Sequence, residues 1–423
     1  MCIWEKSYPM KKCYVFSAGC IRRGLDTIHI QRYLQANDWI LTRNMRQADL
    51  IVIATCGVVK LNEINSLRAV QKASQVKSKS ARIVVTGCLP KINPAEIRKL
   101  GDFIFVPTGE LSKFDSVIQA RIPFPQFGAP DSITDNKDIT NYLVARSFCR
   151  RSKPYKWLFH RFSMNGPFLT ASVAGNKSIE YVKSLVTRVP RRKVVPYFNI
   201  RIAEGCMSDC TYCATKFATG RLKSRPIEKI VTEFRDGLQK GYKMFQLIAE
   251  DTGCYGLDIG SSLAELLRQL FAIEGEYQLV IIDCCPQWLV EQHDELMPVL
   301  IRNQDKIKEI FVPLQSGSDR MLKLMSRQYE AESVRKVLHE LKDRAPGIAI
   351  RTSFLIGFPG ETEDDFDATK AFIRAVKFDE VTINRYEDRP GTESSIMHGK
   401  IDQEIIENRA RFLAEKMGCR ILS

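Results

Sequence analysis

The sequence lacks any run of about 18 uncharged apolar residues, the length that a membrane-spanning helix needs. Its first residues also lack the basic-then-apolar order of a secretory signal peptide. The sequence shows no internal repeat and no low-complexity tract. These absences argue against a membrane, secreted or repeat protein. We therefore expect a cytoplasmic protein without a membrane partner.

Length and composition favour a globular protein with more than one domain. At roughly 100 to 200 residues per domain, 423 residues predict two or three domains. Disorder is not indicated, because hydrophobic residues make up 44% of the chain and 22 Phe, 13 Tyr and 4 Trp are available for cores. Lys and Arg outnumber Asp and Glu by 63 to 49, a net charge of +14 that favours an anionic partner such as nucleic acid or an acidic peptide.

Cysteine usage indicates ligands and not disulfides. The chain has 13 cysteines, an odd number, and it is too long to depend on disulfide staples. A reduced compartment, with thiolates used as metal ligands, explains this usage better.

The first hundred residues alternate β-branched runs with helical patterns, which predicts a parallel sheet covered by helices. Three of the expected strands run into a cysteine, namely Cys20, Cys56 and Cys88. Ligands collect at the carboxyl ends of strands in open parallel sheets, so these thiols could meet at one edge. The expected strands cover 14–16, 50–53, 83–85 and 103–106.

Between residues 123 and 196 the periodicity fades and basic and aromatic residues alternate. From residue 146 to 193 there are 12 Lys or Arg against one acid, Glu180. This mixture suits phosphates and stacked bases. A solvated connector that packs its rings on a neighbouring domain remains an equal alternative.

A second series of strand and helix patterns predicts a complete or partial β/α barrel, with its active site where strands end and loops begin. The expected strands cover 198–202, 244–248, 279–282, 309–312, 348–355 and 380–383, with helices such as 263–271 and 331–341 between them. After Thr392 only one helical stretch is expected, at about 403–417. We therefore divide the chain into an N-terminal α/β domain (1–122), a connecting segment (123–196), a barrel (197–395) and a helical tail (396–423).

Cys206, Cys210 and Cys213 follow the first strand of the barrel with the spacing C-x3-C-x2-C. Three thiolates in one loop can hold three irons of a [4Fe-4S] cluster and leave the fourth iron open. A zinc site would need a fourth protein ligand nearby, and no His or Cys follows at a suitable spacing. This pattern also argues against three unrelated core cysteines.

At these residues the sequence resembles the radical SAM superfamily, and within it the methylthiotransferase branch. That branch pairs the barrel with an N-terminal domain that holds a second [4Fe-4S] cluster. The resemblance covers about residues 12 to 110 and 197 to 395. It is carried by Gly19-Cys20, Thr55-Cys56, Gly87-Cys88, Pro313-Leu314-Gln315-Ser316-Gly317-Ser318, Met325-Ser326-Arg327, Arg351-Thr352, Ile356-Gly357-Phe358-Pro359-Gly360-Glu361-Thr362 and Arg389-Pro390-Gly391-Thr392.

The resemblance implies a mechanism and its cofactors. S-adenosylmethionine (SAM) would bind the open iron of the Cys206/Cys210/Cys213 cluster and be cleaved by one electron to a 5'-deoxyadenosyl radical. A methylated sulfur from the auxiliary cluster, held by the other three cysteines, would then be transferred to the substrate radical. A reducing partner such as flavodoxin or ferredoxin is implied, and the cofactors carry the hard chemistry.

The resemblance also implies candidate contacts with SAM, although each residue alone could be structural. Gly357 would let the backbone approach the adenine closely. The other candidates are Tyr212, near the adenosine, and Glu250, Gln315, Ser316, Arg327 and Arg351. Buried free cysteines behave as small hydrophobes. We take Cys2, Cys13, Cys149, Cys254, Cys284, Cys285 and Cys419 as non-ligands.

The sequence departs from the family in two places. Arg23 and Ala54 stand where the family commonly has Asn, and both would border the auxiliary cluster and could alter its potential. The family usually adds a small β-rich TRAM domain that grips the substrate, but only about thirty residues follow Thr392. The basic segment could take over that grip, with Arg150, Arg151, Lys153, Lys156, Arg191 and Arg192 as candidate substrate contacts.

The function that we expect is a radical SAM methylthiotransferase with two [4Fe-4S] clusters. Its substrate would be large, with a tRNA adenosine preferred over a peptide or protein side chain, including a natural-product precursor. A different radical reaction, with the auxiliary cluster as an electron acceptor, is an alternative. A non-enzymatic iron-sulfur or nucleic-acid-binding protein is disfavoured, because binding alone needs no open iron beside a set of SAM contacts.

Overall fold

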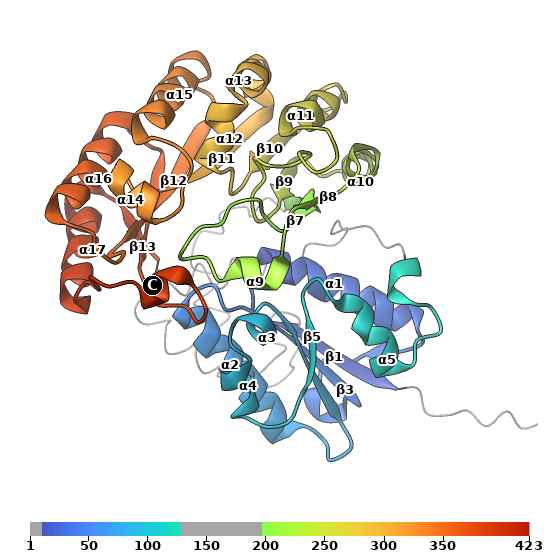
Figure 1. Ribbon diagram of the computed structural model, residues 1–423. Coiled ribbons are helices and arrows are strands. Elements are labelled where there is room, and N and C mark those ends of the chain that lie inside the picture. The colour runs from blue at the N-terminus through green and yellow to red at the C-terminus, as the bar shows by residue number, and fades with distance from the viewer. Residues whose placement is uncertain (1–10, 128–196, 423) are drawn as a thin grey trace, which may run out of the picture.

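A five-stranded parallel sheet organises the N-terminal part of the computed structural model, which describes residues 11–127 and 197–422 (Figure 1). The strand order is β2-β1-β3-β4-β5. The three central strands carry their cysteines just beyond their carboxyl ends, so these residues start from the same edge. The strands are β1 (Lys12–Ser17), β2 (Ile40–Leu41), β3 (Leu50–Thr55), β4 (Arg82–Gly87) and β5 (Ile104–Pro107).

Helices cover both faces of this N-terminal sheet. Leu50 and Val52 of β3 pack with α1 and α5, whereas Ile51 and Ile53 pack with α2 and α4. Successive strand residues point to opposite faces, so a strand buried on both sides reads as a continuous apolar run. The helices are α1 (Ile21–Ala36), α2 (Lys60–Val76), α3 (Leu89–Ile92), α4 (Pro94–Arg98) and α5 (Phe114–Ile118), with 3-10 turns η1 (Met45–Gln47), η2 (Leu111–Lys113) and η3 (Phe124–Gln126).

Seven parallel strands form the second sheet, in the order β14-β13-β12-β11-β10-β9-β6. This order has two ends, so the described residues form a partial barrel. A short antiparallel pair, β7 (Ala203–Glu204) and β8 (Lys223–Ser224), lies beside it. The seven strands are β6 (Tyr197–Arg201), β9 (Met244–Ile248), β10 (Gln278–Ile281), β11 (Ile307–Gln315), β12 (Ala349–Ile356), β13 (Glu380–Arg385) and β14 (Arg420–Ile421).

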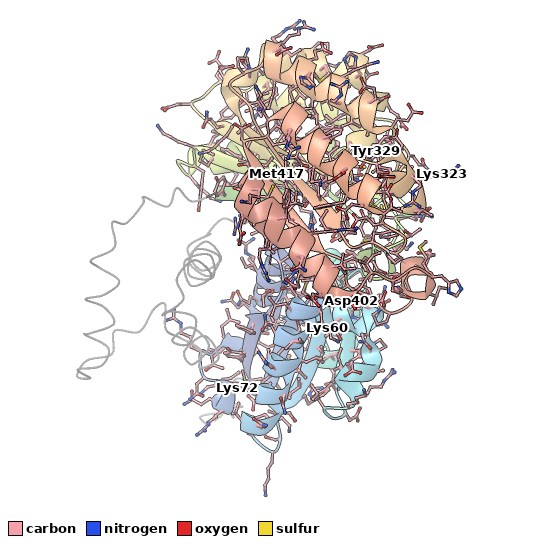
Figure 2. All side chains as sticks on the ribbon, turned by 90° about the vertical axis from the view of Figure 1, so that its left-hand side faces the viewer. Lys60, Lys72, Lys323, Tyr329, Asp402 and Met417 are labelled. Atoms are coloured by element: carbon pink, nitrogen blue, oxygen red, sulfur yellow. The ribbon has the colours of Figure 1, made fainter. Side chains whose placement is uncertain are left out.

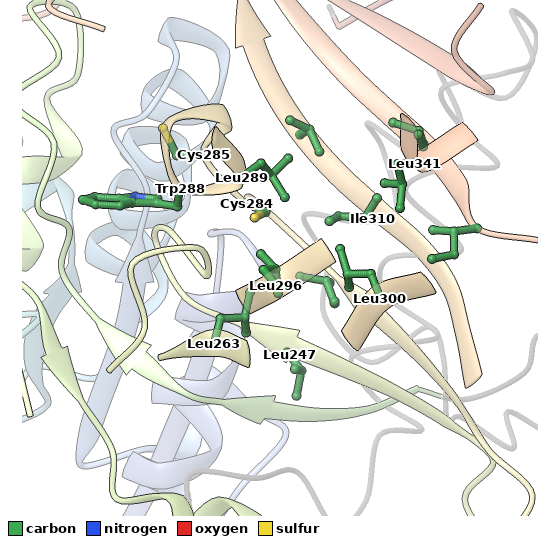
Figure 3. Close-up of a cluster of buried hydrophobic side chains, with 14 of the residues drawn as sticks. Leu247, Leu263, Cys284, Cys285, Trp288, Leu289, Leu296, Leu300, Ile310 and Leu341 are labelled. Atoms are coloured by element: carbon green, nitrogen blue, oxygen red, sulfur yellow. The ribbon is translucent and has the colours of Figure 1, made fainter. Parts of the chain in front are cut away.

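The helices between these strands bury one continuous core against the sheet (Figures 1 and 3). Figure 3 shows Leu247 of β9, Leu263 of α11 and Leu300 of α13 lining this core together with Cys284. The helices are α9 (Thr215–Thr219), α10 (Ile227–Gln239), α11 (Leu263–Phe271), α12 (Pro286–Glu291), α13 (His293–Arg302), α14 (Asp319–Leu324), α15 (Ala331–Arg344), α16 (Glu363–Val376) and α17 (Gln403–Met417), with η5 (Gln304–Lys306) and η6 (Glu393–Ile396).

The predicted fold class is confirmed, since a parallel α/β sheet precedes a partial β/α barrel. The expected strands are all present, and the helix predicted at 403–417 is α17. The two-residue strands β2, β7, β8 and β14 were not predicted, because two residues carry no periodic signal. The proposed domain limits stay a prediction. None of the helices in the described ranges has the length and apolar character needed to cross a membrane.

The two sheets meet at the ends of their strands. Figure 2 labels Lys60, at the start of α2, and Asp402, just before α17, on the side where the two parts of the chain meet. The backbone N–H of Lys60 donates to Glu387, which follows β13, over 2.8 Å. Arg22 of α1 donates to the carbonyl of Ala249, which follows β9, over 2.7 Å. Residues that follow the carboxyl ends of strands in both sheets therefore face one another.

Candidate active site between the two sheets

The first set of thiols lies in the loop of residues 206–213 between β7 and α9, which we call the Cys206 loop. Gly205, just before it, has a φ of +75°, and a Cβ there would lie 2.1 Å from the carbonyl oxygen of Arg221, so only glycine fits. Within the loop, the N–H of Thr211 donates to the carbonyl of Met325 over 3.2 Å. The close packing of Gly205 against Arg221 and the hydrogen bond from Thr211 to Met325 thus fix the position of the Cys206 loop.

Arg327 is a cation that contacts a sulfur of the Cys206 loop. Its guanidinium donates to the sulfur of Cys210 over 3.3 Å and to the carbonyl of Pro313 over 2.8 Å. Burial, together with the charge of nearby Asp251, raises the pKa of the Cys206 thiol to about 12. The N–H of Ser208 donates to the Cys206 sulfur over 3.3 Å. A thiolate here therefore needs a bound cation, which a metal cluster supplies.

The second set, Cys20, Cys56 and Cys88, lies where helices begin, and we call it the N-terminal cysteine set. Cys20 is the N-cap of α1, Cys88 is the N-cap of α3, and Cys56 follows β3. A hydrogen bond with the Cys56 thiol lowers the pKa of Cys20, and the charges of Arg22 and Arg23 lower it further. Burial is the main cause that raises the pKa of Cys88 to about 11, and the charge of Cys20 raises it too.

Neighbouring polar groups complete the N-terminal cysteine set. Asn62 of α2 places its amide Nδ2 3.8 Å from the Cys56 sulfur. The N–H of Cys56 donates to the hydroxyl of Ser66 over 2.9 Å, and that hydroxyl lies 3.2 Å from the Cys56 carbonyl. Since Ala54 has no polar side chain, Asn62 supplies the neutral amide near the second cysteine.

Both thiol sets fit iron-sulfur clusters better than a single metal ion. Within the described ranges, no three His, Cys, Asp or Glu side chains converge as the ligands of one ion would. Each thiolate of a [4Fe-4S] cluster binds a different iron, so its three sulfurs surround the cluster and do not meet at a point. Each set consists of three thiols, without a carboxylate or an imidazole, and thiolates are the ligands that such clusters use.

A buried chain of charges joins the two thiol sets. Arg23 places Nη2 3.5 Å from a carboxylate oxygen of Glu250, and the other oxygen of Glu250 accepts from the N–H of Gly205 over 3.0 Å. Arg201, at the end of β6, forms an ion pair with Asp26 of α1. Side chains from both sheets are therefore interlocked directly between Cys20 and the Cys206 loop.

The structure brings Tyr212, Gln315, Arg327 and Glu250 to this region, each in a different environment. Tyr212 packs in a small cluster with Met325 and Phe358, and burial raises the pKa of its hydroxyl. Gln315 ends β11 with a φ of +70°, a left-handed conformation uncommon outside glycine. Glu250 is engaged with the arginines of α1, which the sequence did not indicate.

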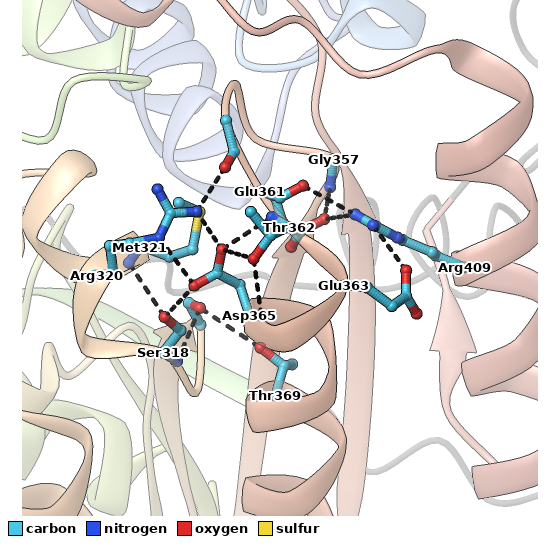
Figure 4. A network of polar contacts seen from close by, with 12 residues as sticks. Ser318, Arg320, Met321, Gly357, Glu361, Thr362, Glu363, Asp365, Thr369 and Arg409 are labelled. Carbon is cyan, nitrogen blue, oxygen red and sulfur yellow. Dashed lines mark hydrogen bonds and ion pairs between the residues drawn. The ribbon is translucent and has the colours of Figure 1, made fainter.

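Ser316 and Gly357 make packing contacts within the barrel, and Figure 4 shows Gly357 beside Glu361. The hydroxyl of Ser316 accepts from the N–H of Ser318 over 3.1 Å and lies 3.5 Å from that of Thr369, in a buried position. Gly357 has a φ of +82°, and a Cβ there would lie 2.3 Å from Ile406 of α17. Ile406 of α17 therefore fills the space on the Cβ side of Gly357, and the expected approach of its backbone to the adenine stays a prediction.

Arg351 is a candidate that lies away from the Cys206 loop. It stands near the start of β12, whereas the candidate site follows the ends of the strands. Its guanidinium pairs with Glu309 of β11 over 2.7 Å and with Glu380 of β13 over 3.1 Å. Arg351 thus bridges three neighbouring strands at the opposite end of the sheet.

Asp251 is a site residue that sequence reasoning missed. Its carboxylate is buried and accepts from the indole Nε1 of Trp288 over 2.7 Å and from the N–H of Cys285 over 3.1 Å. Burial raises the pKa of Asp251. The pair Glu250-Asp251 directly after a buried strand was the available signal, since adjacent carboxylates at a strand end are unusual core residues.

The remaining sequence predictions fall in the core or outside the described ranges. Cys254, Cys284, Cys285 and Cys419 belong to the core of the second sheet, and Figure 3 shows Cys284 beside Leu289. Cys13 belongs to the core of the N-terminal sheet. Outside the described residues lie Cys2, Cys149, Arg150, Arg151, Lys153, Lys156, Arg191 and Arg192.

Two family models match the chain. Residues 200–373 match the radical SAM superfamily, and residues 12–106 match the uncharacterized protein family UPF0004. Among solved structures, the radical SAM methyltransferase TsrM from Kitasatospora setae, with cobalamin and a [4Fe-4S] cluster bound, is similar with a TM-score of 0.60 at 13% identity. That match covers 92% of this chain and 77% of TsrM. At this identity the likeness concerns the fold alone.

Curated relatives narrow the family. A probable threonylcarbamoyladenosine tRNA methylthiotransferase of Pyrococcus abyssi is 30% identical over 404 residues, which cover 96% of this chain and 83% of the relative. The ribosomal protein uS12 methylthiotransferase RimO of Clostridium tetani is 30% identical over 398 residues, covering 93% and 79%. The chain belongs to the radical SAM methylthiotransferase family, and is therefore a transferase that uses SAM and a [4Fe-4S] cluster.

Proposed function

We propose that this enzyme holds two [4Fe-4S] clusters and inserts a methylthio group at an unactivated C–H bond of a large substrate. The observation that carries the proposal is the buried chain of charges from Arg23 through Glu250 to Gly205, which holds the N-terminal cysteine set against the Cys206 loop. Transfer of sulfur from one site to a carbon radical formed at another requires the two sites to be held in a fixed, close geometry.

The residues of the site have distinct roles in this reaction. Cys206, Cys210 and Cys213 would hold the cluster that binds SAM and would supply radical chemistry at the substrate carbon, and Cys20, Cys56 and Cys88 would hold the cluster that would supply the sulfur. Arg327 fixes the Cys206 loop by joining the Cys210 sulfur to the Pro313 carbonyl. Tyr212 and Phe358 pack edge to face, with ring centroids 6.5 Å apart, and so exclude water on one side of that loop.

A tRNA adenosine is the substrate that we favour. The net charge of +14 favours a polyanion, and the Pyrococcus abyssi relative is named as a tRNA methylthiotransferase. A protein side chain is the second candidate, since other relatives are named as uS12 methylthiotransferases. Exposed apolar side chains beside both cysteine sets, such as Val58 and Met207, each 44% exposed, would suit a peptide.

Iron content and products test the two-cluster proposal. We would reconstitute the wild type and a Cys20/Cys56/Cys88→Ala variant anaerobically and supply SAM and dithionite. We expect about eight irons per chain in the wild type and about four in the variant, with a methylated sulfur species formed only by the wild type. Cys13→Ala, at a buried cysteine of the same sheet, is the matched control and should match the wild type.

A wild type with one cluster that only makes 5'-deoxyadenosine would refute the proposal. In that case the enzyme would carry out radical chemistry without sulfur transfer from a second cluster.

Salt dependence separates the two substrate candidates. Binding of a tRNA by phosphate contacts releases counterions, so its affinity should fall steeply as salt rises. Recognition of a peptide in apolar pockets should give a shallow slope. We would measure binding of unmodified tRNA and of a uS12 loop peptide from 50 to 200 mM salt. Binding of the peptide alone would overturn the preference for tRNA.

A further inference from the structure

Arg23 is a buried cation in the first turn of α1, three residues after Cys20. Its side chain is 2% exposed. Its aliphatic stem lies across Gly19, where a Cβ would come within 2.6 Å of the Arg23 Cβ. Gly19 is therefore needed so that the guanidinium of Arg23 can remain between the N-terminal cysteine set and the second sheet.

Arg23 belongs to a network of ion pairs in which Arg22 and Arg201 also have carboxylate partners of their own, Asp283 and Glu204. Nη1 of Arg23 lies 2.8 Å from Asp26, but Arg201 also pairs with Asp26, and Glu250 is shared with Arg22. Nε of Arg23 has no hydrogen-bond partner among the residues that the structure describes. The guanidinium also interacts electrostatically with the thiols of Cys20 and Cys88. A nearby anion would therefore be attracted to it.

The first turn of α1 strengthens this positive field. It contains Arg22 and Arg23 and no acidic residue. A helix N-terminus already carries a partial positive charge, so basic residues in the first turn oppose the helix dipole. Ion pairs with Asp283 and Glu250 offset part of this cost, and an anionic cluster held by thiolates would offset more of it.

We propose that Arg23 supplies a fixed positive charge to a cluster held by the N-terminal cysteine set and thereby raises the reduction potential of that cluster. The reduced cluster carries one more negative charge than the oxidised cluster, so a buried cation favours reduction. This inference rests on the proposed second cluster. Arg23 acts here as a positioning residue: it sets the charge beside the cluster and, through Glu250, links it to the Cys206 loop.

The test measures the second cluster alone. A Cys206/Cys210/Cys213→Ala background removes the cluster that binds SAM, and a titration with dithionite and mediators is followed by electron paramagnetic resonance. The variants are compared at the solution potential at which half of the cluster in this background protein is reduced. At that potential, Arg23→Gln should lower the ratio of reduced to oxidised cluster at least tenfold. A tenfold change corresponds to 59 mV for a one-electron couple. Arg23→Lys keeps the charge and should stay within about threefold.

Asp283→Asn supplies a matched change of opposite sign. Asp283 pairs with Arg22 and acts on Cys20 from the second sheet. Its φ of +53° is one that Asn tolerates, so the backbone should not change. Loss of this negative charge should raise the ratio of reduced to oxidised cluster. A loosened contact between the sheets would instead shift Arg23→Gln and Asp283→Asn in the same direction.

The outcomes separate this inference from the proposed function. If the Cys206/Cys210/Cys213→Ala protein binds no iron, the second cluster is absent and the proposed function fails with it. If it binds about four irons but Arg23→Gln leaves the ratio unchanged, only the inference fails. If Arg23→Gln does not fold, the test rests on Asp283→Asn. A ratio of reduced to oxidised cluster that Asp283→Asn leaves unchanged or lowers would overturn the inference.

Discussion

Gly357 illustrates how one residue can match a family motif and yet serve the packing of the barrel. Its φ of +82° requires a left-handed conformation, and Ile406 of α17 occupies the place where a side chain would begin. Its N–H donates to Glu361 over 2.8 Å, and Glu361 pairs with Arg409 of α17 over 2.7 Å. The motif therefore joins α17 to the barrel (Figure 4).

Substitution of Gly357 by Ala should destabilise the protein more than substitution of Gly360. Both glycines have a φ near +80°, so each substitution carries a backbone cost of about 1–2 kcal/mol. At Gly360 the nearest atom, of Leu324, is 4.0 Å away, whereas Ile406 obstructs Gly357 and adds about 1–3 kcal/mol. Thermal unfolding measures the difference. Equal destabilisation of the two variants would contradict the packing role of Ile406, and adding Ile406→Ala should restore part of the loss.

At the scale of elements, an ion pair joins the start of α13 to α15. His293 places Nδ1 3.0 Å from Asp294 and Nε2 2.7 Å from Glu340. Hydrogen bonds to Asp294 and Glu340 raise the pKa of His293, and the bond from His293 lowers the pKa of Glu340. The pair is partly exposed, so solvent screening keeps its contribution below about 1 kcal/mol.

The stabilisation from this pair should depend on pH in a defined window. Because the pKa of folded His293 is raised, its contribution is full below the unfolded pKa of about 6.5 and is lost as pH rises through the folded pKa. The lowered pKa of Glu340 means that the contribution is also lost as pH falls below about 4.5. The difference in unfolding temperature between wild type and His293→Gln should thus be largest near pH 5.5 and shrink by pH 8.5. His398→Gln, at an exposed histidine, is the control; a His293→Gln difference that is flat with pH would exclude the pair.

At the scale of the whole molecule, a second buried contact holds the two sheets together. Arg389, in the loop after β13, pairs with Glu63 of α2 over 2.6 Å, and both side chains are almost fully buried. Asn93 also donates to Glu63 over 2.9 Å. The motif Arg389-Pro390-Gly391-Thr392 thus docks the barrel on the helix that carries Asn62, next to Cys56.

Removal of the Glu63 charge should loosen the contact between the sheets. Glu63→Gln leaves Arg389 buried without its counterion, which costs about 3–5 kcal/mol. We expect a fall of several degrees in unfolding temperature and faster proteolysis between the sheets. Glu63→Gln/Arg389→Met should lose less than the sum of the single variants, because no lone buried charge remains. Glu96→Gln, on the surface, should change nothing; if Glu63→Gln behaves like it, the pair does not hold the sheets together.

Several features of this protein were predictable from the sequence because their signals are local. The apolar runs at 50–53 and 83–85 and the alternation of strands and helices gave the fold class. The spacing of Cys206, Cys210 and Cys213 placed three thiols in one loop, since eight consecutive residues cannot separate far. The position of Cys20, Cys56 and Cys88 after neighbouring parallel strands likewise predicted their common edge.

Other features depended on which residues the tertiary fold brings together. Arg351 and Arg327 look alike in the sequence, but Arg351 lies near the start of β12, whereas Arg327, between α14 and α15, lies beside Cys210. Glu250 meets Arg23 only because the strand ends of two sheets, more than two hundred residues apart in sequence, face each other. The sequence by itself determined the fold class and the position of the cysteines in it. The packing of the two sheets decided which charged side chains surround those cysteines, because electrostatic interactions depend on distance in space.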